Sequence, residues 1–370
     1  MERLSTLGIN RTQQALLLLL RAGLWEKIPN TSEPFPLSDK EWAEVAKLAG
    51  HQTIQGIVFR GMQLLPPELL PPKQQLWNWS MTITRLEADY KRTTAAVSAT
   101  QNLLSKIGMT VWLQKGLAVA RYYSQPSRRV NGDIDWYVSA TGSETNIKDL
   151  LQKKGYTIHR SADDSLCFEY DGIIVELHKY LTDLLSTRGR EAEETLIHSE
   201  TLESLELPDG TKSIVPGPCT TLLMLLTHIL KHISTVGIGL RQCCDLARAC
   251  HVLHHHYDVS MLLTACHHAH LDRWCCLIGL YLTEILSLPA EECPWRIDSP
   301  NQRELNNMHY LLHDILRSGN FGHQNINHPS LINTALNTMR RLPFSLRYAP
   351  AETIQRTITL FSNRIIKNNT

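Results

Sequence analysis

Strand-like runs are confined to the middle of this 370-residue chain, and that distribution constrains its fold most. Between about 106 and 216, short β-branched and aromatic runs alternate with two short helical patterns. On either side, apolar residues recur at helical spacing. The pattern predicts an α+β fold with a small mixed β-sheet flanked by N- and C-terminal helical regions.

Proline and glycine suggest where the three regions meet. A helical pattern from 74 to 107 contains neither residue, and Pro216-Gly217-Pro218 interrupts the sequence before the last helical region. We therefore expect an N-terminal helical region at 1–104, an α+β core at 105–216 and a C-terminal helical domain at 217–370.

The middle region has its own order of expected elements. Asp171-Gly172 is a strong signal for a two-residue hairpin between two strands. We expect strands at 109–113, 133–138, 156–159, 166–170 and 173–177, and helices at 117–123 and 143–154.

Composition narrows the class of partner. The 37 basic and 36 acidic residues give a formal charge of +1, which disfavours a nucleic-acid track and a templated polymerase. No stretch reaches the roughly 20 apolar residues that a membrane span needs. Nine cysteines and no export signal predict reduced thiols. We expect a soluble cytoplasmic protein.

The sharpest local feature is a pair of aspartates. Residues two apart in a strand point to the same face, so Asp133 and Asp135 would project together while Ile134 faces the core. Adjacent carboxylates repel each other unless a cation lies between them. The pair predicts a site for Mg²⁺ or Mn²⁺, which prefer oxygen ligands.

A third carboxylate lies further along the chain. In Val175–His178, Glu176 and His178 share one strand face. If this strand lies beside the aspartate strand, Asp133, Asp135 and Glu176 form a catalytic and metal-binding triad. Such a triad can hold two divalent ions for in-line phosphoryl displacement. His178 is expected either to support Glu176 or simply to pack.

Candidates for binding phosphate lie on both sides of this triad. Lys115-Gly116 ends one strand and opens a helix, where backbone N–H groups favour phosphate. Arg129 would add charge, and Gly132 forms the turn before the aspartates. Together with Arg241, these residues are the predicted nucleotide-binding set.

Four residues of the last region pair at helical spacing. His228 and His232 share one helix face, as do Arg241 and Asp245. They form either a buried polar network between two helices or the wall of a cleft opposite Asp133. In the second case Arg241 binds a phosphate, and the others support the site.

These residues carry a family resemblance. The runs Leu113–Ala118, Arg129–Asp135 and Val175–His178 resemble the nucleotidyltransferase superfamily, which has the DNA polymerase beta-like fold. More narrowly, with Thr227–His232 and the segment from Leu240 to Ala247, they resemble the bacterial group of uncharacterised nucleotidyltransferases. The resemblance implies a glycine motif, an Asp-x-Asp pair, a third acid and a bacterial source. The chain departs from the superfamily at Gly116-Leu117, where Gly-Ser or Gly-Gly is usual.

The expected reaction is transfer of a nucleoside monophosphate from an NTP to a hydroxyl or phosphate acceptor, with release of diphosphate. Asp133 and Asp135 would bind both ions, and Glu176 would bind the one nearer the acceptor and help deprotonate it. The acceptor stays open among sugar phosphate, antibiotic, protein side chain and RNA end. Two alternatives are a non-catalytic protein that binds nucleotide or a partner, and a scaffold in which the aspartates are structural.

Two further patterns have ordinary structural interpretations. His251 and His255, and Cys266 and His270, have helical i,i+4 spacing but lack a four-ligand zinc pattern. We expect partly exposed histidines there, with a metal site as the alternative. Six basic residues between Leu331 and Thr370 predict a solvated helix face, with an anion-binding patch as the alternative.

Overall fold

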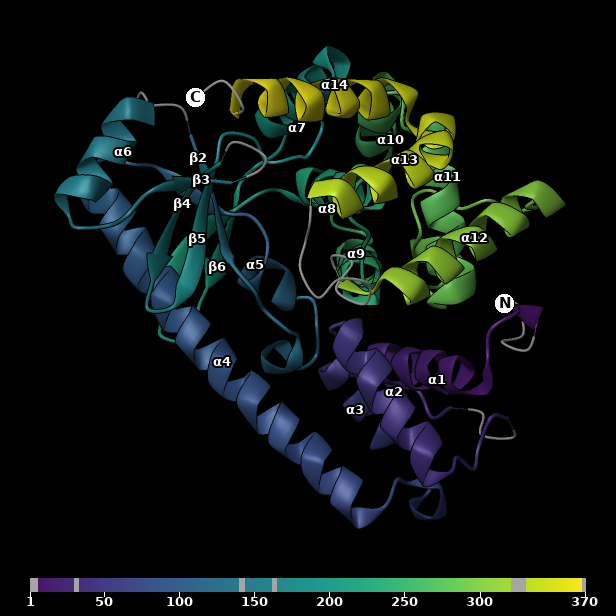
Figure 1. Ribbon diagram of the computed structural model, residues 1–370. Helices are drawn as coiled ribbons and strands as arrows, with labels where there is room; N and C mark the ends of the chain where they lie inside the picture. The colour runs from purple at the N-terminus through teal and green to yellow at the C-terminus, as the bar shows by residue number, and fades with distance from the viewer. Residues whose placement is uncertain (1–5, 30–32, 140–143, 162–164, 321–330, 368–370) are drawn as a thin grey trace.

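The computed structural model describes residues 6–29, 33–139, 144–161, 165–320 and 331–367 (Figure 1). Its helices lie on both sides of a central sheet. The first helices are α1 (Arg11–Trp25), α2 (Asp39–His51), α3 (Gln55–Met62) and the long α4 (Lys73–Lys106). Capping boxes at Asn10 and Ser38 begin α1 and α2. Each of these side chains accepts a hydrogen bond from a backbone N–H in the first turn, which would otherwise be unpaired.

The central sheet has five strands in the order β1-β2-β5-β4-β3. Only β2 and β5 are parallel, and the other neighbours are antiparallel, so the sheet is mixed as predicted. The strands are β1 (Val111–Leu113), β2 (Ile134–Val138), β3 (His159–Arg160), β4 (Leu166–Tyr170) and β5 (Ile173–His178). Asp171 and Gly172 form the predicted turn between β4 and β5, both at positive φ.

One face of the sheet is covered by helices and forms a core of its own. Trp136 and Val175 are fully buried there against Val97 and Leu104 of α4 and Leu151 of α6 (Glu144–Lys153). The Trp136 indole N–H donates to the hydroxyl of Thr100 on α4. This packing leaves alternate residues of β2 and β5 on the opposite face, toward α5 (Leu117–Ala120) and α8 (Pro218–Ile233).

The first three helices pack on the last region. One continuous core contains apolar side chains from α1, α2 and α3 and from α8, α9 (Leu240–Leu253), α11 (Asp272–Leu280) and α12 (Gln302–Ser318). The buried Gln52 amide links the parts, since it accepts from the Leu240 N–H and donates to the Ile315 carbonyl. The two cores thus do not follow the three sequence regions, and the domain boundaries stay a prediction.

The remaining elements are helices, one β-hairpin and short turns. They are α7 (Thr187–Ser199), the hairpin β6 (Glu203–Glu206) and β7 (Lys212–Val215), α10 (Val259–His268), a π-turn at Tyr281–Ile285, α13 (Leu331–Tyr348) and α14 (Pro350–Lys367). Short 3-10 turns lie at Pro67–Leu69, Pro126–Arg128 and Ala290–Glu292. Within the described residues, no helix is long and apolar enough to cross a membrane.

Several local expectations need correction. The strand expected at 156–159 begins only at His159, because Tyr156 instead packs its ring on Phe168 from a loop. The helix expected at 117–123 has only four residues and ends at Ala120. The sequence reading missed α7 and the β6–β7 hairpin. The serine expected to open α6 lies outside the described residues.

Candidate functional site

Strand register places two carboxylates opposite each other. In the parallel pairing of β2 and β5, Asp135 is the partner of Glu176. Their neighbours Trp136 and Leu177 face the covered core, so both carboxylates point to the other face of the sheet. His178, two residues after Glu176, lies on that same face.

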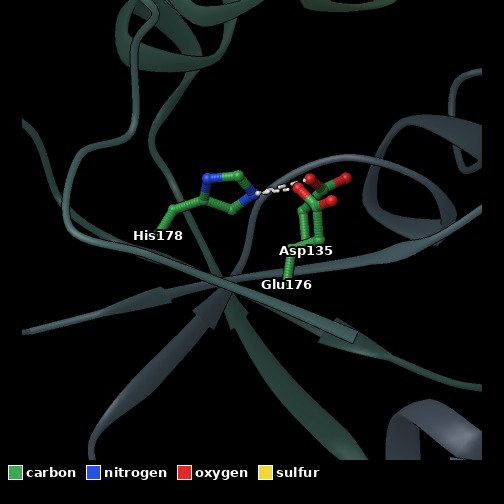
Figure 2. A group of neighbouring side chains, drawn as sticks. All are labelled: Asp135, Glu176 and His178. Carbon is green, nitrogen blue, oxygen red and sulfur yellow. Dashed lines mark hydrogen bonds and ion pairs between the residues drawn. The ribbon is translucent and has the colours of Figure 1, made fainter. Parts of the chain in front are cut away.

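The three side chains converge on a single point (Figure 2). The His178 Nε2 lies 2.8 Å from Asp135 Oδ1 and 3.3 Å from Glu176 Oε2. One ligand atom from each of the three lies within 4.8 Å of the others, so the group could hold a metal ion. Burial alone would lower the pKa of His178, but its hydrogen bonds to Asp135 and Glu176 raise it to about 9. The protonated imidazole therefore neutralises part of the carboxylate charge.

Asp133 lies outside this close group. It precedes the first residue of β2, so the pleat of the strand does not fix its side chain beside Asp135. It nevertheless lines the same cavity. The charge of Asp135, together with burial and Glu176, raises the pKa of Asp133. The close group is thus Asp135, Glu176 and His178, and Asp133 joins them only as part of the cavity lining, so the metal-binding triad stays a prediction.

Lys115 supplies positive charge to the carboxylates. Its Nζ lies 3.7 Å from Asp135 Oδ1, and both side chains are largely buried. Burial opposes ionisation, but Asp135, Asp183 and Asp133 together raise the pKa of Lys115. Lys115 and His178 in turn hold the pKa of Asp135 below its usual range against the effect of burial. Gly116 at φ 55° makes the turn that aims Lys115 inward.

Arg129 is committed to a protein carboxylate. Its Nε and Nη2 donate to the two oxygens of Asp245 at 2.8 and 2.7 Å, and both side chains are almost fully buried. The Tyr123 hydroxyl donates to the same carboxylate. This network fixes α9 against the turn before β2. Arg129 also lines the cavity, so its part in binding a triphosphate stays a prediction, while its contacts show that it positions this turn.

Arg241 faces the cavity with weaker partners. Its Nε donates to the Thr53 hydroxyl, and its Nη1 donates to the Val130 carbonyl. Burial and the nearby charge of Arg129 lower its pKa. Among the described residues its guanidinium makes no ion pair, so an anionic ligand would relieve this desolvated charge.

The two histidines of α8 also line the cavity. His228 Nδ1 and Lys231 Nζ lie 2.9 and 2.8 Å from the two oxygens of Asp183. Burial and the charge of Lys115 lower the pKa of His228 to about 4, and burial holds the pKa of His232 well below its usual range. Both imidazoles are therefore neutral near pH 7. The two alternatives for these histidines, a polar network and a cavity wall, are therefore compatible. His228 is bonded to Asp183, and both histidines line the cavity.

A cavity of about 330 Å³ brings the predicted residues together. That volume lies at the lower end of the roughly 300–1,000 Å³ typical of small-molecule sites. Its lining includes every predicted site residue: Lys115, Gly116, Arg129, Gly132, Asp133, Asp135, Glu176, His178, His228, His232, Arg241 and Asp245.

Sequence reasoning missed several residues around the cavity. Lys231 lies three residues after His228, so helical spacing could have found it. Ser165, whose hydroxyl lies 2.9 Å from His178 Nδ1, and Asp183 carry no signal in the sequence, because only the fold brings them there.

The other clusters have structural partners. His251 pairs with Glu292, and all nine cysteines are free, eight of them buried. The basic stretch near the C-terminus is not simply a solvated face. Arg341 is buried in an ion pair with Asp314, which also binds Arg340. The side chains of Arg364 and Lys367 lie outside the described residues.

An α+β fold with carboxylates on adjacent strands, facing a cavity that cations also line, is the arrangement expected of a nucleotidyltransferase. The chain matches the family model described as "Uncharacterised nucleotidyltransferase" over residues 38–287, more than half of its length, and it belongs to that family. The curated proteins contain no match. Among solved structures, it is similar to an antigenic nucleotidyltransferase-like protein from Paracoccidioides brasiliensis. The two are 14% identical, with a TM-score of 0.33, over 53% of this chain and 92% of that one.

Proposed function

We propose that the protein transfers a nucleoside monophosphate from an NTP to a hydroxyl or phosphate acceptor and releases diphosphate. One observation carries the proposal: Asp135, Glu176 and His178 converge in a cavity that Lys115 and Arg241 also line. Carboxylates that can hold a divalent cation, next to side chains that can bind phosphate, suit a nucleotide bound together with a metal ion.

The side chains fit a hard divalent cation. Crowding by Asp135 and Glu176 raises the pKa of Asp133, which is the mark of carboxylate oxygens that lack sufficient positive charge. Oxygen donors of this kind are those that Mg²⁺ and Mn²⁺ prefer. Asp133, Asp135 and Glu176 would hold the ions, and His178 would have to yield its contacts to them. Bound there, a divalent cation would lower the charge on the phosphates and on the attacking oxygen.

The chain's own residues divide the remaining work. Lys115 and Arg241 bind the triphosphate, and Arg129 with Asp245 positions the turn that carries Gly132. The helix α5 has only four residues, so its dipole adds little, and phosphate binding depends on these side chains. The acceptor oxygen forms a bond to the α-phosphorus, Glu176 accepts its proton, and the bond to diphosphate breaks with its electron pair.

A nucleotide screen tests the proposal without knowledge of the acceptor. We expect one NTP to raise the thermal midpoint in the presence of Mg²⁺ or Mn²⁺, because a ligand of the folded state stabilises it by mass action. Asp135→Asn should abolish this rise. Glu169→Gln is the matched control, since Glu169 is exposed on β4 away from the cavity. A rise that survives in Asp135→Asn would contradict the proposal.

One observation favours a second function, nucleotide binding without transfer. Where the superfamily usually has serine or glycine, Leu117 is buried in the core of the sheet and offers no hydroxyl to a phosphate. This alternative predicts a metal-dependent rise in the thermal midpoint with no diphosphate release from any acceptor offered. Diphosphate release that Asp135→Asn removes would exclude it.

A further inference from the structure

A second cavity adjoins the first beyond the end of β5. Its volume is about 250 Å³, and Lys115, His178 and Lys231 line both cavities. Gly116, Gly132 and Arg241 line only the first cavity. The second cavity therefore lies on the His178 side of the carboxylates, away from the residues proposed to hold the triphosphate.

The charges around the two cavities differ in kind. The first contains four acidic residues among its lining, which balance its cations. The second contains one acidic residue, Asp183, against five basic residues: Lys115, Lys179, Arg190, Lys231 and Arg356. Three of these cations have carboxylate partners: Arg190 pairs with the buried Glu193, Lys231 with Asp183 and Lys115 with Asp135. The five cations still outnumber these three carboxylates, and an excess of cations in a concave site favours an anionic ligand.

The wall of the second cavity is held in place from several elements. The segment after β5 is fixed at Tyr180, whose carbonyl accepts from the Gln114 amide at 2.8 Å and whose ring lies 3.4 Å from the Arg190 guanidinium. Arg356 of α14 donates to the Asp183 carbonyl at 2.6 Å. Arg190 and Arg356 therefore stand in fixed positions before a ligand arrives, which lowers the entropic cost of binding.

We propose that this second cavity binds the anionic group, phosphate or carboxylate, of the acceptor substrate. The inference rests on the proposed function and adds the chemical class of the acceptor to it. A molecule anchored at Lys179 and Arg190 can extend past His178 to Glu176, the group proposed to take the proton of the attacking hydroxyl. The NTP would occupy the first cavity at the same time.

Charge reversal at an exposed cation tests the anion site. We would measure the thermal midpoint with inorganic phosphate or acetate, without divalent metal, at an ionic strength matched with sodium chloride. Wild type should be stabilised by at least one of the anions, and the arm that responds tells phosphate from carboxylate. Lys179→Glu should weaken that binding at least about fivefold, and Lys179→Arg should restore it.

The control variant is Lys154→Glu, which makes the same change of charge at an exposed lysine outside both cavities. If neither anion stabilises the wild type, or if Lys179→Glu responds like Lys154→Glu, the anion site is overturned. Midpoints without ligand show whether each variant still folds.

Simultaneous binding tests the role as acceptor site. With the NTP and Mg²⁺ of the nucleotide screen present, the Lys179-dependent stabilisation should persist. If the NTP removes it, the cavity holds part of the nucleotide, and the acceptor role is overturned. If the stabilisation persists but no NTP binds, the anion site stands while the acceptor role falls together with the proposed transfer.

Discussion

At the residue scale, the site depends on charges that are paired before any ligand arrives. His178 lies between Asp135 and Glu176, Lys115 faces Asp135, and Arg129 is bound to Asp245. Buried charges are costly unless they are paired, so each partner holds the other in its ionised form. The cavity is therefore polar and preorganised, which favours a charged ligand.

The Arg129–Asp245 pair gives a prediction about stability. Asp245→Ala should lower the free energy of unfolding by about 3–5 kcal/mol, because it leaves the buried Arg129 guanidinium without its carboxylate. Urea unfolding measures the difference. Glu44→Ala, which removes an exposed ion pair with Lys47, should change it by less than about 1 kcal/mol. Equal losses in the two variants would contradict the account.

The same pair predicts the direction of a pH effect. Burial opposes the charge of Asp245, but Arg129 lowers its pKa below the ordinary value of 3.8. The Arg129–Asp245 pair therefore stabilises the folded protein above about pH 4. This contribution declines as pH falls toward the pKa of Asp245 in the folded protein. Wild type should lose more stability than Asp245→Ala between pH 5 and pH 3, roughly the range in which an unfolded aspartate titrates. Parallel loss in both proteins would contradict this assignment.

At the element scale, the sequence predicted what depends on local pattern. Alternating polarity predicted β5, the Asp171-Gly172 turn predicted its hairpin with β4, and a long helical pattern without glycine or proline predicted α4. Pairing between distant strands was not readable. That Asp135 lies opposite Glu176, and that Lys231 and Asp183 meet beside them, follows from register and packing over long chain separations.

The crossing of α1 and α3 gives a prediction at this scale. The helices approach so closely that a Cβ at Gly61 would lie 2.0 Å from the Leu19 carbonyl oxygen. Gly61→Ala should therefore destabilise the protein by about 1–3 kcal/mol, or more if the helices cannot separate. Gly50→Ala, at a helical position where a Cβ would make only an ordinary contact, 3.8 Å from the Gln55 amide nitrogen, should stabilise it by about 0.5–1 kcal/mol. Thermal or urea unfolding compares them, and a neutral Gly61→Ala would contradict the close contact.

At the scale of the whole molecule, distant parts of the chain are joined. α4 runs from the first helices to the sheet, and α1–α3 share one core with the last region (Figure 1). The Arg21 guanidinium donates to the carbonyls of Glu284 and Ile285 across this core. The cavity lies where the sheet meets α8 and α9, so its two walls come from separate parts of the sequence.

This arrangement predicts that the helical regions do not fold separately. A fragment of residues 105–370 lacks α1–α4, which leaves apolar surface of both cores exposed. It should show no cooperative thermal transition by circular dichroism, whereas the full chain should show one. A cooperative transition in the fragment would show that the C-terminal helices form a core without α1–α4.

The central claim is that the carboxylates of β2 and β5 hold a divalent cation together with an NTP. Electron paramagnetic resonance of Mn²⁺, titrated with protein in the presence of the selected NTP, measures that binding directly. Wild type and Glu169→Gln should bind Mn²⁺ alike, and Asp135→Asn should bind it at least about tenfold more weakly. Equal Mn²⁺ affinity in Asp135→Asn and wild type would contradict the account.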